Sequence, residues 1–200
     1  MKKISYFLLA PLLFLFVTTL YAAGQPPVEM LKTTANQMLS ALKNSGGKSS
    51  TVRKIVRQIL LPRVDVPSMS RAVVGREYWT SASAAQRKEF ENQFVKLVIK
   101  TYATPLSNYT NEKIKFYPIR GYDPSSNRTQ VMSNIVRDNG PPIPVSYRLV
   151  KYGNDWKVYD FSVEGVSMVQ SYRSQFESTL RQNGFEGLLK QLRKYNQGNQ

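Results

Sequence analysis

The sequence contains no cysteine and no histidine among its 200 residues. Without cysteine there is no disulfide, no thiol nucleophile and no thiolate metal site. Without histidine, the histidine-based catalytic triads, the usual acid–base shuttle and the commonest zinc ligand sets are excluded as well. A metal ion would have to be held by oxygen ligands alone.

Acidic residues are scarce too. The chain has 13 Asp and Glu against 28 Lys and Arg, which gives a formal charge of +15 at pH 7. An excess of this size favours an anionic partner: nucleic acid, anionic lipid or an acidic protein surface. Nothing in the chain resembles a nucleophile elbow, a phosphate-binding loop or a dinucleotide fingerprint.

The N-terminus has the three-part layout of a secretory signal peptide. A basic start at Lys2 and Lys3 precedes an almost wholly apolar run over residues 4–20 and small residues at 22–24. Such a segment is removed on export, so residues 1–23 are predicted to be cleaved and residues 24–200 to form one domain, with the cut at any of positions 22–24. The alternative is an uncleaved membrane anchor, but a span needs about 20 apolar residues and this run is shorter.

Export narrows the choice of partner. A secreted chain of this size without disulfides is typical of the bacterial periplasm. We therefore expect a protein of the Gram-negative periplasm, where nucleic acid is not a partner.

Helical patterns open and close the predicted domain. Residues 26–43 predict a first helix, and the amphipathic spacing that starts at Val52 predicts a second over residues 51–61. The outward side of this second helix carries Arg53, Lys54 and Arg57, a basic surface that we expect to dock on a partner protein.

The later helices are marked by their caps. Ser83 and Gln86 form a capping box before a long helix that Pro105 is expected to end or kink. Ser167 and Gln170 form a second predicted capping box before another helix, which Gly184 is expected to end in a left-handed conformation.

Between the helices the apolar period changes from 3.6 to 2. This period predicts strands over residues 113–117, 131–136, 145–149 and 156–163, with Gly153-Asn154 as the turn of a hairpin. Four consecutive strands with short links favour an antiparallel, twisted sheet. The predicted fold class is therefore α+β, a curved antiparallel sheet of about four strands packed against several helices.

Two stretches form a pattern that is more specific than periodicity. The first contains Val64-Asp65, Arg71, Val74-Gly75, Trp79, Gln86, Phe90, Phe94, Leu97, Tyr102 and Leu106. The second contains Val145-Ser146-Tyr147-Arg148-Leu149, Trp156-Lys157-Val158-Tyr159-Asp160, Val163-Glu164-Gly165-Val166-Ser167, Tyr172-Arg173, Phe176, Gly184 and Gly187-Leu188. Over residues 30–190 the chain resembles the MlaC family, the toluene-tolerance family of periplasmic phospholipid-binding proteins. It departs from the family pattern at Val74, where a leucine is expected, and at Pro105.

The resemblance implies a soluble periplasmic carrier of glycerophospholipids. Such carriers move lipid between an outer-membrane lipoprotein–porin complex and the substrate-domain ring of an inner-membrane ABC transporter, and so maintain outer-membrane lipid asymmetry. They bury the acyl chains in an apolar cavity and leave the headgroup at the surface. They have no catalytic activity and need no metal or cofactor, the bound phospholipid being cargo.

The apolar faces of the predicted helices and strands are the candidate lining of that cavity. Val158 and Phe161 have opposite parity along one strand, so only a bulge would let both face the lipid. The expected lipid-binding residues are Phe90, Phe94, Leu97, Val98, Val131, Ile135, Val145, Tyr147, Leu149, Val158, Phe161, Val163, Val166, Val169, Tyr172 and Phe176.

Two arginines are the headgroup candidates. Arg148 and Arg173 could each give a bidentate contact to a phosphate. The alternative for both is an ion pair with Asp160 or Glu164.

One catalytic alternative stays open. Asp160 and Glu164 share a face of one predicted strand. A small cone-shaped α+β isomerase or hydrolase can work with a single carboxylate base. The competing interpretation of the two carboxylates is a solvated strand end or an ion pair with a nearby arginine.

Overall fold

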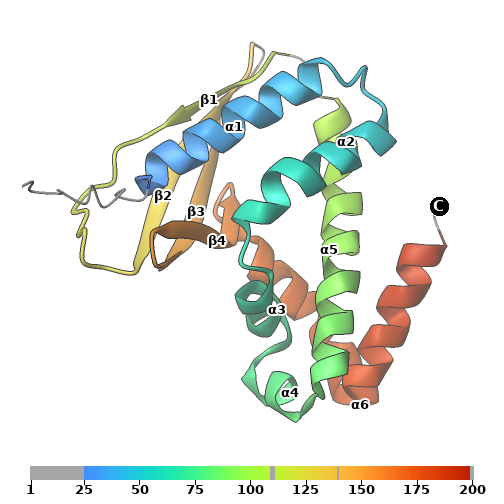
Figure 1. Ribbon diagram of the computed structural model, residues 1–200. Coiled ribbons are helices and arrows are strands. Elements are labelled where there is room, and N and C mark those ends of the chain that lie inside the picture. Colours follow the sequence, from blue (N-terminus) through green and yellow to red (C-terminus); the bar gives the residue numbers. More distant parts are fainter. Residues whose placement is uncertain (1–24, 109–110, 139, 199–200) are drawn as a thin grey trace, which may run out of the picture.

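The computed structural model describes residues 25–108, 111–138 and 140–198, so the predicted signal peptide lies outside the described residues (Figure 1). The helices are α1 (Pro27–Lys43), α2 (Ser49–Ile55), α3 (Val66–Val74), α4 (Arg76–Ser81), α5 (Ala84–Ser107) and α6 (Met168–Gln197). A π-helical turn, η1 (Val56–Leu60), and a 3₁₀ turn, η2 (Leu61–Arg63), follow α2 directly. The second predicted helix is therefore regular only in its first half.

The predicted helix caps are present. Ser83 accepts a hydrogen bond from the Gln86 N–H at 3.2 Å, and the Gln86 side chain accepts one from the Ser83 N–H at 2.9 Å. The helix that they begin, α5, runs through Pro105 to Ser107, beyond the end that the sequence predicted. Because Pro105 lies in the last turn, its missing N–H costs only one hydrogen bond there.

The strands are β1 (Lys113–Phe116), β2 (Arg128–Val136), β3 (Ile143–Tyr152), β4 (Asp155–Val163) and β5 (Val166–Ser167). They pair in sequence order and antiparallel throughout, and Tyr152 pairs with Asp155 across the predicted hairpin turn. The α+β class and the antiparallel sheet are confirmed. The sheet has five strands rather than about four, because the chain turns back after Val163 into the two-residue β5.

A β-bulge interrupts the pairing of β3 with β4. Arg148 pairs with Asp160 and Leu149 pairs with Val158, so that Tyr159 is the extra residue on β4. The bulge shifts the side-chain alternation by one position. Val158 and Phe161 consequently lie on the same face of the sheet. Their partners on the neighbouring strand β3 are Leu149 and Tyr147, whose side chains share that face.

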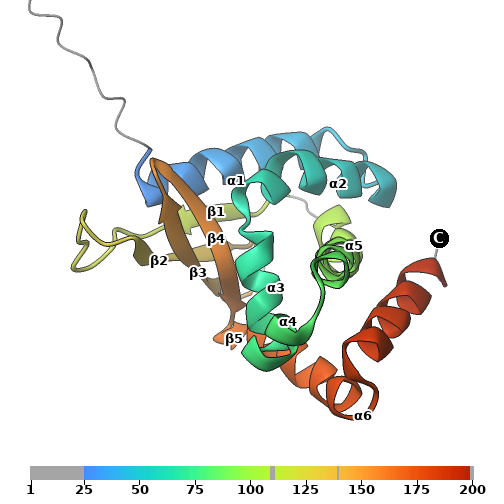
Figure 2. The same ribbon diagram turned by 60° about the horizontal axis from the view of Figure 1, so that its bottom comes forward.

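The two faces of the sheet differ in what covers them. The inner face, which carries Val131 and Leu149, packs against Met30 and Leu31 of α1. In Figure 2 the helices lie above and to the right of the sheet. The opposite side, called the outer face below, carries Lys115, Arg128, Met132 and Arg148, because these residues alternate with the inner ones.

The buried apolar residues form three clusters instead of one core. One cluster joins α3, α5 and α6, a second joins α1 to the sheet, and a third joins α1, α2 and α5. The first is rich in stacked and edge-to-face rings, with Phe90 and Phe94 5.5 Å apart. The region where the clusters meet is the natural place for a cavity, because none of them fills it.

Gly184 divides α6 into two segments. Its φ of 63° and ψ of −168° are non-helical, and only glycine adopts this region readily. The positive φ agrees with the predicted glycine break, but the conformation is extended rather than left-handed helical. The second segment folds back along α5 and buries Phe185, Leu188, Leu189 and Leu192.

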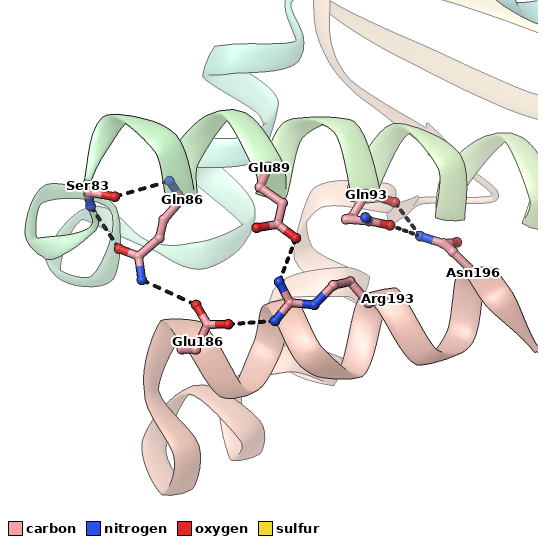
Figure 3. Close-up of polar contacts among 7 residues, drawn as sticks. All are labelled: Ser83, Gln86, Glu89, Gln93, Glu186, Arg193 and Asn196. Atoms are coloured by element: carbon pink, nitrogen blue, oxygen red, sulfur yellow. Dashed lines mark hydrogen bonds and ion pairs between the residues drawn. The ribbon is translucent and has the colours of Figure 1, made fainter.

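Polar side chains fasten this second segment to α5 (Figure 3). Arg193 donates to Glu89 at 2.7 Å and to Glu186 at 2.5 Å. Asn196 donates to the Gln93 carbonyl at 3.0 Å and to its side-chain oxygen at 2.8 Å. These bonds fix how the end of α6 lies on α5.

Candidate functional site

An apolar cavity of about 130 Å³ lies where the three clusters meet. Its wall comes from η1, η2, the loop and first turn of α3, the second half of α5, strand β4 and the first residue of α6. The lining residues are Val56, Leu60, Leu61, Val64, Val66, Met69, Phe94, Val95, Val98, Ile99, Tyr102, Leu106, Val158, Phe161 and Met168. The wall contains no charged side chain, so its chemistry suits hydrocarbon.

The π-helical turn contributes directly to this wall. A π turn widens the helix by one residue and is frequent at functional sites. Val56 and Leu60 of this turn line the cavity, and both also pack against the third cluster, in which Val52 and Ile55 of α2 are buried with Met38 and Leu42. The apolar stripe of the predicted second helix therefore packs in the third cluster along its length, and in its second half it also contributes to the cavity wall.

Four of the sequence-predicted lipid residues line the cavity. Phe94 and Val98 reach it from α5, and Val158 and Phe161 reach it from β4. The bulge at Tyr159 is what allows the last two to do so together. The ring of Phe161 also packs edge-on against Tyr102, with ring centroids 5.5 Å apart.

Most of the other predicted lipid residues are core. Phe90, Leu97, Tyr172 and Phe176 pack with Phe94 in the first cluster. On the sheet, Val131 and Leu149 are buried in the second cluster, Tyr147 packs against it, and Val145 is buried as well. These eight residues are outside the cavity wall, and their contact with lipid stays a prediction.

The remaining predicted residues lie at the edges of the fold. Ile135, Val163 and Val169 are half-buried, and Val169 packs against the first cluster. Val166, on the short edge strand β5, is 64% exposed. None of these four belongs to the cavity wall described above, and their contact with lipid stays a prediction.

Sequence reasoning missed most of the wall. The missed residues are Val56, Leu60, Leu61, Val64, Val66, Met69, Val95, Ile99, Tyr102, Leu106 and Met168. The amphipathic stripe from Val52 to Leu60 was a usable signal for Val56 and Leu60, but neither was predicted to bind lipid. For Tyr102 burial raises the pKa of the hydroxyl, with the nearby Tyr172 adding to the shift, so the group stays neutral beside the apolar wall.

The headgroup candidates lie away from the wall. Arg148 is on the outer face, with its side chain 55% exposed and its guanidinium 3.8 Å from the Asp160 carboxylate. This is the ion pair that the sequence offered as the alternative. Arg173 is exposed on α6, next to Gly75 at the junction of α3 and α4.

Asp160 has its oxygens engaged in capping α6. Its carboxylate accepts from the Ser167 hydroxyl at 2.7 Å and from the Val169 N–H at 3.1 Å. The Ser167 hydroxyl in turn accepts from the Gln170 N–H at 3.1 Å. A negative charge at a helix N-terminus is stabilising, so the geometry gives Asp160 a structural role.

Within the described residues, no cluster of three or more acidic side chains is placed to hold a metal ion. Nor does any helix in the described part of the chain have the length and hydropathy needed to cross a bilayer.

Comparison with known proteins gives consistent matches over nearly the whole fold. The intermembrane phospholipid transport system binding protein MlaC of Haemophilus influenzae is 30% identical over 183 residues, covering 88% of this chain and 85% of that protein. The toluene tolerance protein ttg2D of Pseudomonas putida is 27% identical over 169 residues, covering 82% of this chain and 78% of that protein.

Structural comparison agrees with the sequence matches. The phospholipid-binding protein of Ralstonia solanacearum, solved in complex with a phospholipid, superposes with a TM-score of 0.79 at 29% identity, over 86% of this chain and 97% of that one. The model of the MlaC protein family matches residues 32–194. The chain therefore belongs to the MlaC family.

Proposed function

We propose that this protein is a periplasmic phospholipid carrier that holds the acyl chains of its cargo in the apolar cavity. The observation that carries the proposal is the cavity wall itself, which brings together apolar side chains from six elements of the fold and no charged ones. The Ralstonia solanacearum relative, with the same fold, was solved with a phospholipid bound.

The cavity is too small to enclose a phospholipid without a change in the packing around it. A space of about 130 Å³ would hold roughly one small ring, comparable to cavities that bind benzene. Pockets that enclose larger ligands have roughly 300–1,000 Å³. Cargo binding therefore requires the three clusters to separate along the cavity, where they are already not in continuous contact.

An apolar sleeve of this kind answers a physical need. Each acyl methylene exposed to water costs about 0.8 kcal/mol, so a diacyl lipid with some thirty of them crosses water very slowly on its own. A carrier must cover the chains and still release them. A cavity that closes on itself when empty lowers the cost of release, because the apolar wall is not left in water.

We propose further that the lipid moves between an outer-membrane lipoprotein–porin complex and the substrate-domain ring of an inner-membrane ABC transporter, maintaining outer-membrane lipid asymmetry. The Haemophilus influenzae relative is named as the binding protein of an intermembrane phospholipid transport system, which supports this step. The signal-peptide pattern of residues 1–23 supports a periplasmic location for a single domain over residues 24–200.

A catalytic function is not part of the proposal. The isomerase or hydrolase alternative depended on Asp160 as a free base. Its carboxylate instead caps α6 and faces Arg148 on the side of the sheet away from the cavity. A general base must reach the proton that it removes from a bound substrate, and this position does not offer that.

Native mass spectrometry of the chain lacking residues 1–23, purified without detergent, tests the proposal. We expect a mass increment that matches phospholipid and disappears on denaturation, with the lipid recovered by organic extraction. A lipid-free mass that persists after incubation with phospholipid vesicles would contradict the carrier function.

A further inference from the structure

Among the described residues, no second layer of helices or strands covers the outer face of the sheet. α1 packs on the inner face, and Figure 2 shows the helices on one side of the sheet. In the described parts of the chain the first turn of α6 does reach the outer side, where the Val169 N–H donates to Asp160. An uncovered sheet face is exposed either to water or to a partner.

This outer face is strongly cationic. Lys113, Lys115 and Arg128 are exposed on it, and Arg148 joins them across the sheet. The described strands contribute two carboxylates to this side. Asp160 is buried, and Asp155 lies at the tip of the β3–β4 hairpin. The charge is therefore of one sign over most of the face, and an anionic partner fits it.

Apolar and aromatic groups lie among these cations. The Lys115 ammonium is 5.6 Å from the centroid of the Tyr117 ring, and the Arg128 guanidinium is 5.6 Å from that of Tyr159. Met132, on the same face of β2, is 46% exposed. Cationic side chains with apolar stems, placed beside aromatic rings, suit a boundary between an apolar phase and a charged, hydrated one.

An open groove adjoins the same face. It is lined by Tyr117, Pro118, Ile119, Arg120, Gln130 and Met132, where the chain leaves β1 and passes beside β2. Its wall offers one guanidinium together with apolar and amide side chains, so a phosphate-bearing group and part of its glycerol could both be accommodated there.

From these observations we infer that the outer face docks on a bilayer surface containing anionic phospholipid. A bilayer is favoured over an acidic protein, because lysine is depleted in the cores of protein–protein interfaces whereas clustered Lys and Arg bind anionic lipid surfaces. The inference does not depend on the cavity holding lipid. It gives Arg148 a different phosphate contact from the one predicted, with headgroups of the bilayer instead of the cargo.

The test uses flotation of the chain lacking residues 1–23 with vesicles of phosphatidylcholine alone or mixed with phosphatidylglycerol. A triple variant, Lys113→Gln, Lys115→Gln and Arg128→Gln, removes three exposed charges from the outer face. Each basic residue near an anionic surface changes affinity by roughly fivefold, so we expect the variant to bind mixed vesicles at least about tenfold more weakly. Binding of the unchanged chain should also weaken as salt increases.

A matched variant removes the same charge elsewhere. Arg53→Gln, Lys54→Gln and Arg57→Gln replace three exposed residues of α2 and η1, which lie away from the outer face. It should bind the vesicles within about twofold of the unchanged chain, since the removed charges lie on the other side of the fold from the docked surface and salt screens distant charges. A charge-conserving variant, Lys113→Arg, Lys115→Arg and Arg128→Lys, should bind normally.

Three outcomes would overturn the inference: no preference for anionic vesicles, equal loss in both neutralised variants, or full binding by the outer-face variant. The first would leave the face to an acidic protein, and the second would mean attraction by net charge alone. Native mass spectrometry of the same variants reads the cavity separately. If the protein carries lipid but does not bind vesicles, only the docking surface is refuted. If it binds vesicles but carries no lipid, only the carrier function is refuted.

Discussion

The Tyr152 hydroxyl donates a hydrogen bond of 2.7 Å to the carboxylate of Asp65, which lies 87 residues earlier in the chain. The same carboxylate accepts from the Ser68 N–H at 3.1 Å and caps α3. The Asp65 N–H donates to the Val158 carbonyl at 2.9 Å. These contacts fasten the start of α3, part of the cavity wall, to the β3–β4 hairpin.

Replacing Tyr152 with Phe should lower the free energy of unfolding by about 1 kcal/mol at neutral pH, because Asp65 is 8% exposed and loses a donor to its charged form. Urea denaturation measures the change. Tyr122→Phe, at a tyrosine 40% exposed in the β1–β2 loop, is the matched control and should be neutral. An unchanged stability in Tyr152→Phe would mean that water replaces the bond without cost.

The Asp65 contacts also predict a pH dependence. Burial by itself raises the pKa of this carboxyl, but the hydrogen bonds from Ser68 and Tyr152 outweigh burial and hold the pKa below its ordinary value of 3.8. The resulting stabilisation is complete above the unfolded-state pKa and is lost as pH falls through the lower folded pKa. The difference between the unchanged chain and Tyr152→Phe should therefore shrink in urea titrations repeated near pH 3. A difference that grows on acidification would contradict this assignment.

Val98→Glu tests the cavity as the cargo site. A carboxylate on the half-buried wall of α5 would have to be desolvated against acyl chain, so co-purified phospholipid should fall several-fold while the far-ultraviolet circular dichroism is kept. Val166→Glu is the control, since Val166 was predicted from sequence but is 64% exposed outside the wall. Equal lipid loss in both variants would place part of the site at β5.

The Arg193 contacts of Figure 3 predict a shift at a neighbouring carboxylate. Hydrogen bonds from Arg193 and Gln86 hold the pKa of Glu186 below its ordinary value. In Arg193→Gln the pKa of Glu186 should therefore rise toward that value in an NMR titration of the side-chain carboxyl. Lys194→Gln removes the same charge from an exposed neighbour and should leave the Glu186 pKa nearly unchanged. A shift of similar size in both would indicate a general charge effect.

Gly184→Ala should destabilise the junction between the two segments of α6. The space around a new Cβ is open, so the cost comes from the backbone, which would be held at a φ of 63° and a ψ of −168°. For a residue with a side chain this conformation costs about 1–3 kcal/mol, visible as a lower melting temperature. Gly198→Ala, at a φ of −73°, should have little effect. An equal melting temperature for Gly184→Ala would mean that the kink relaxes freely.

Local patterns predicted the elements well where local physics forms them. The Ser83–Gln86 capping box, the hairpin between Tyr152 and Asp155 and the break at Gly184 depend on residues within a few positions of one another. The π turn of η1 was not predictable in this way. Its residues have the apolar spacing of a regular α-helix. Whether they form an α turn or a π turn depends on the segments that this apolar stripe packs against.

By itself, the sequence determined the absence of thiol and imidazole chemistry, the positive charge, the α+β class and the supply of apolar residues. The tertiary structure alone decided which of those residues line the cavity and which way Arg148 points. The bulge at Tyr159 moves Phe161 to the side of Val158, and strand register places Arg148 on the outer face. Periodicity predicts on which side of a helix or strand a residue lies. Only the pairing of segments distant in sequence determines what packs against that side.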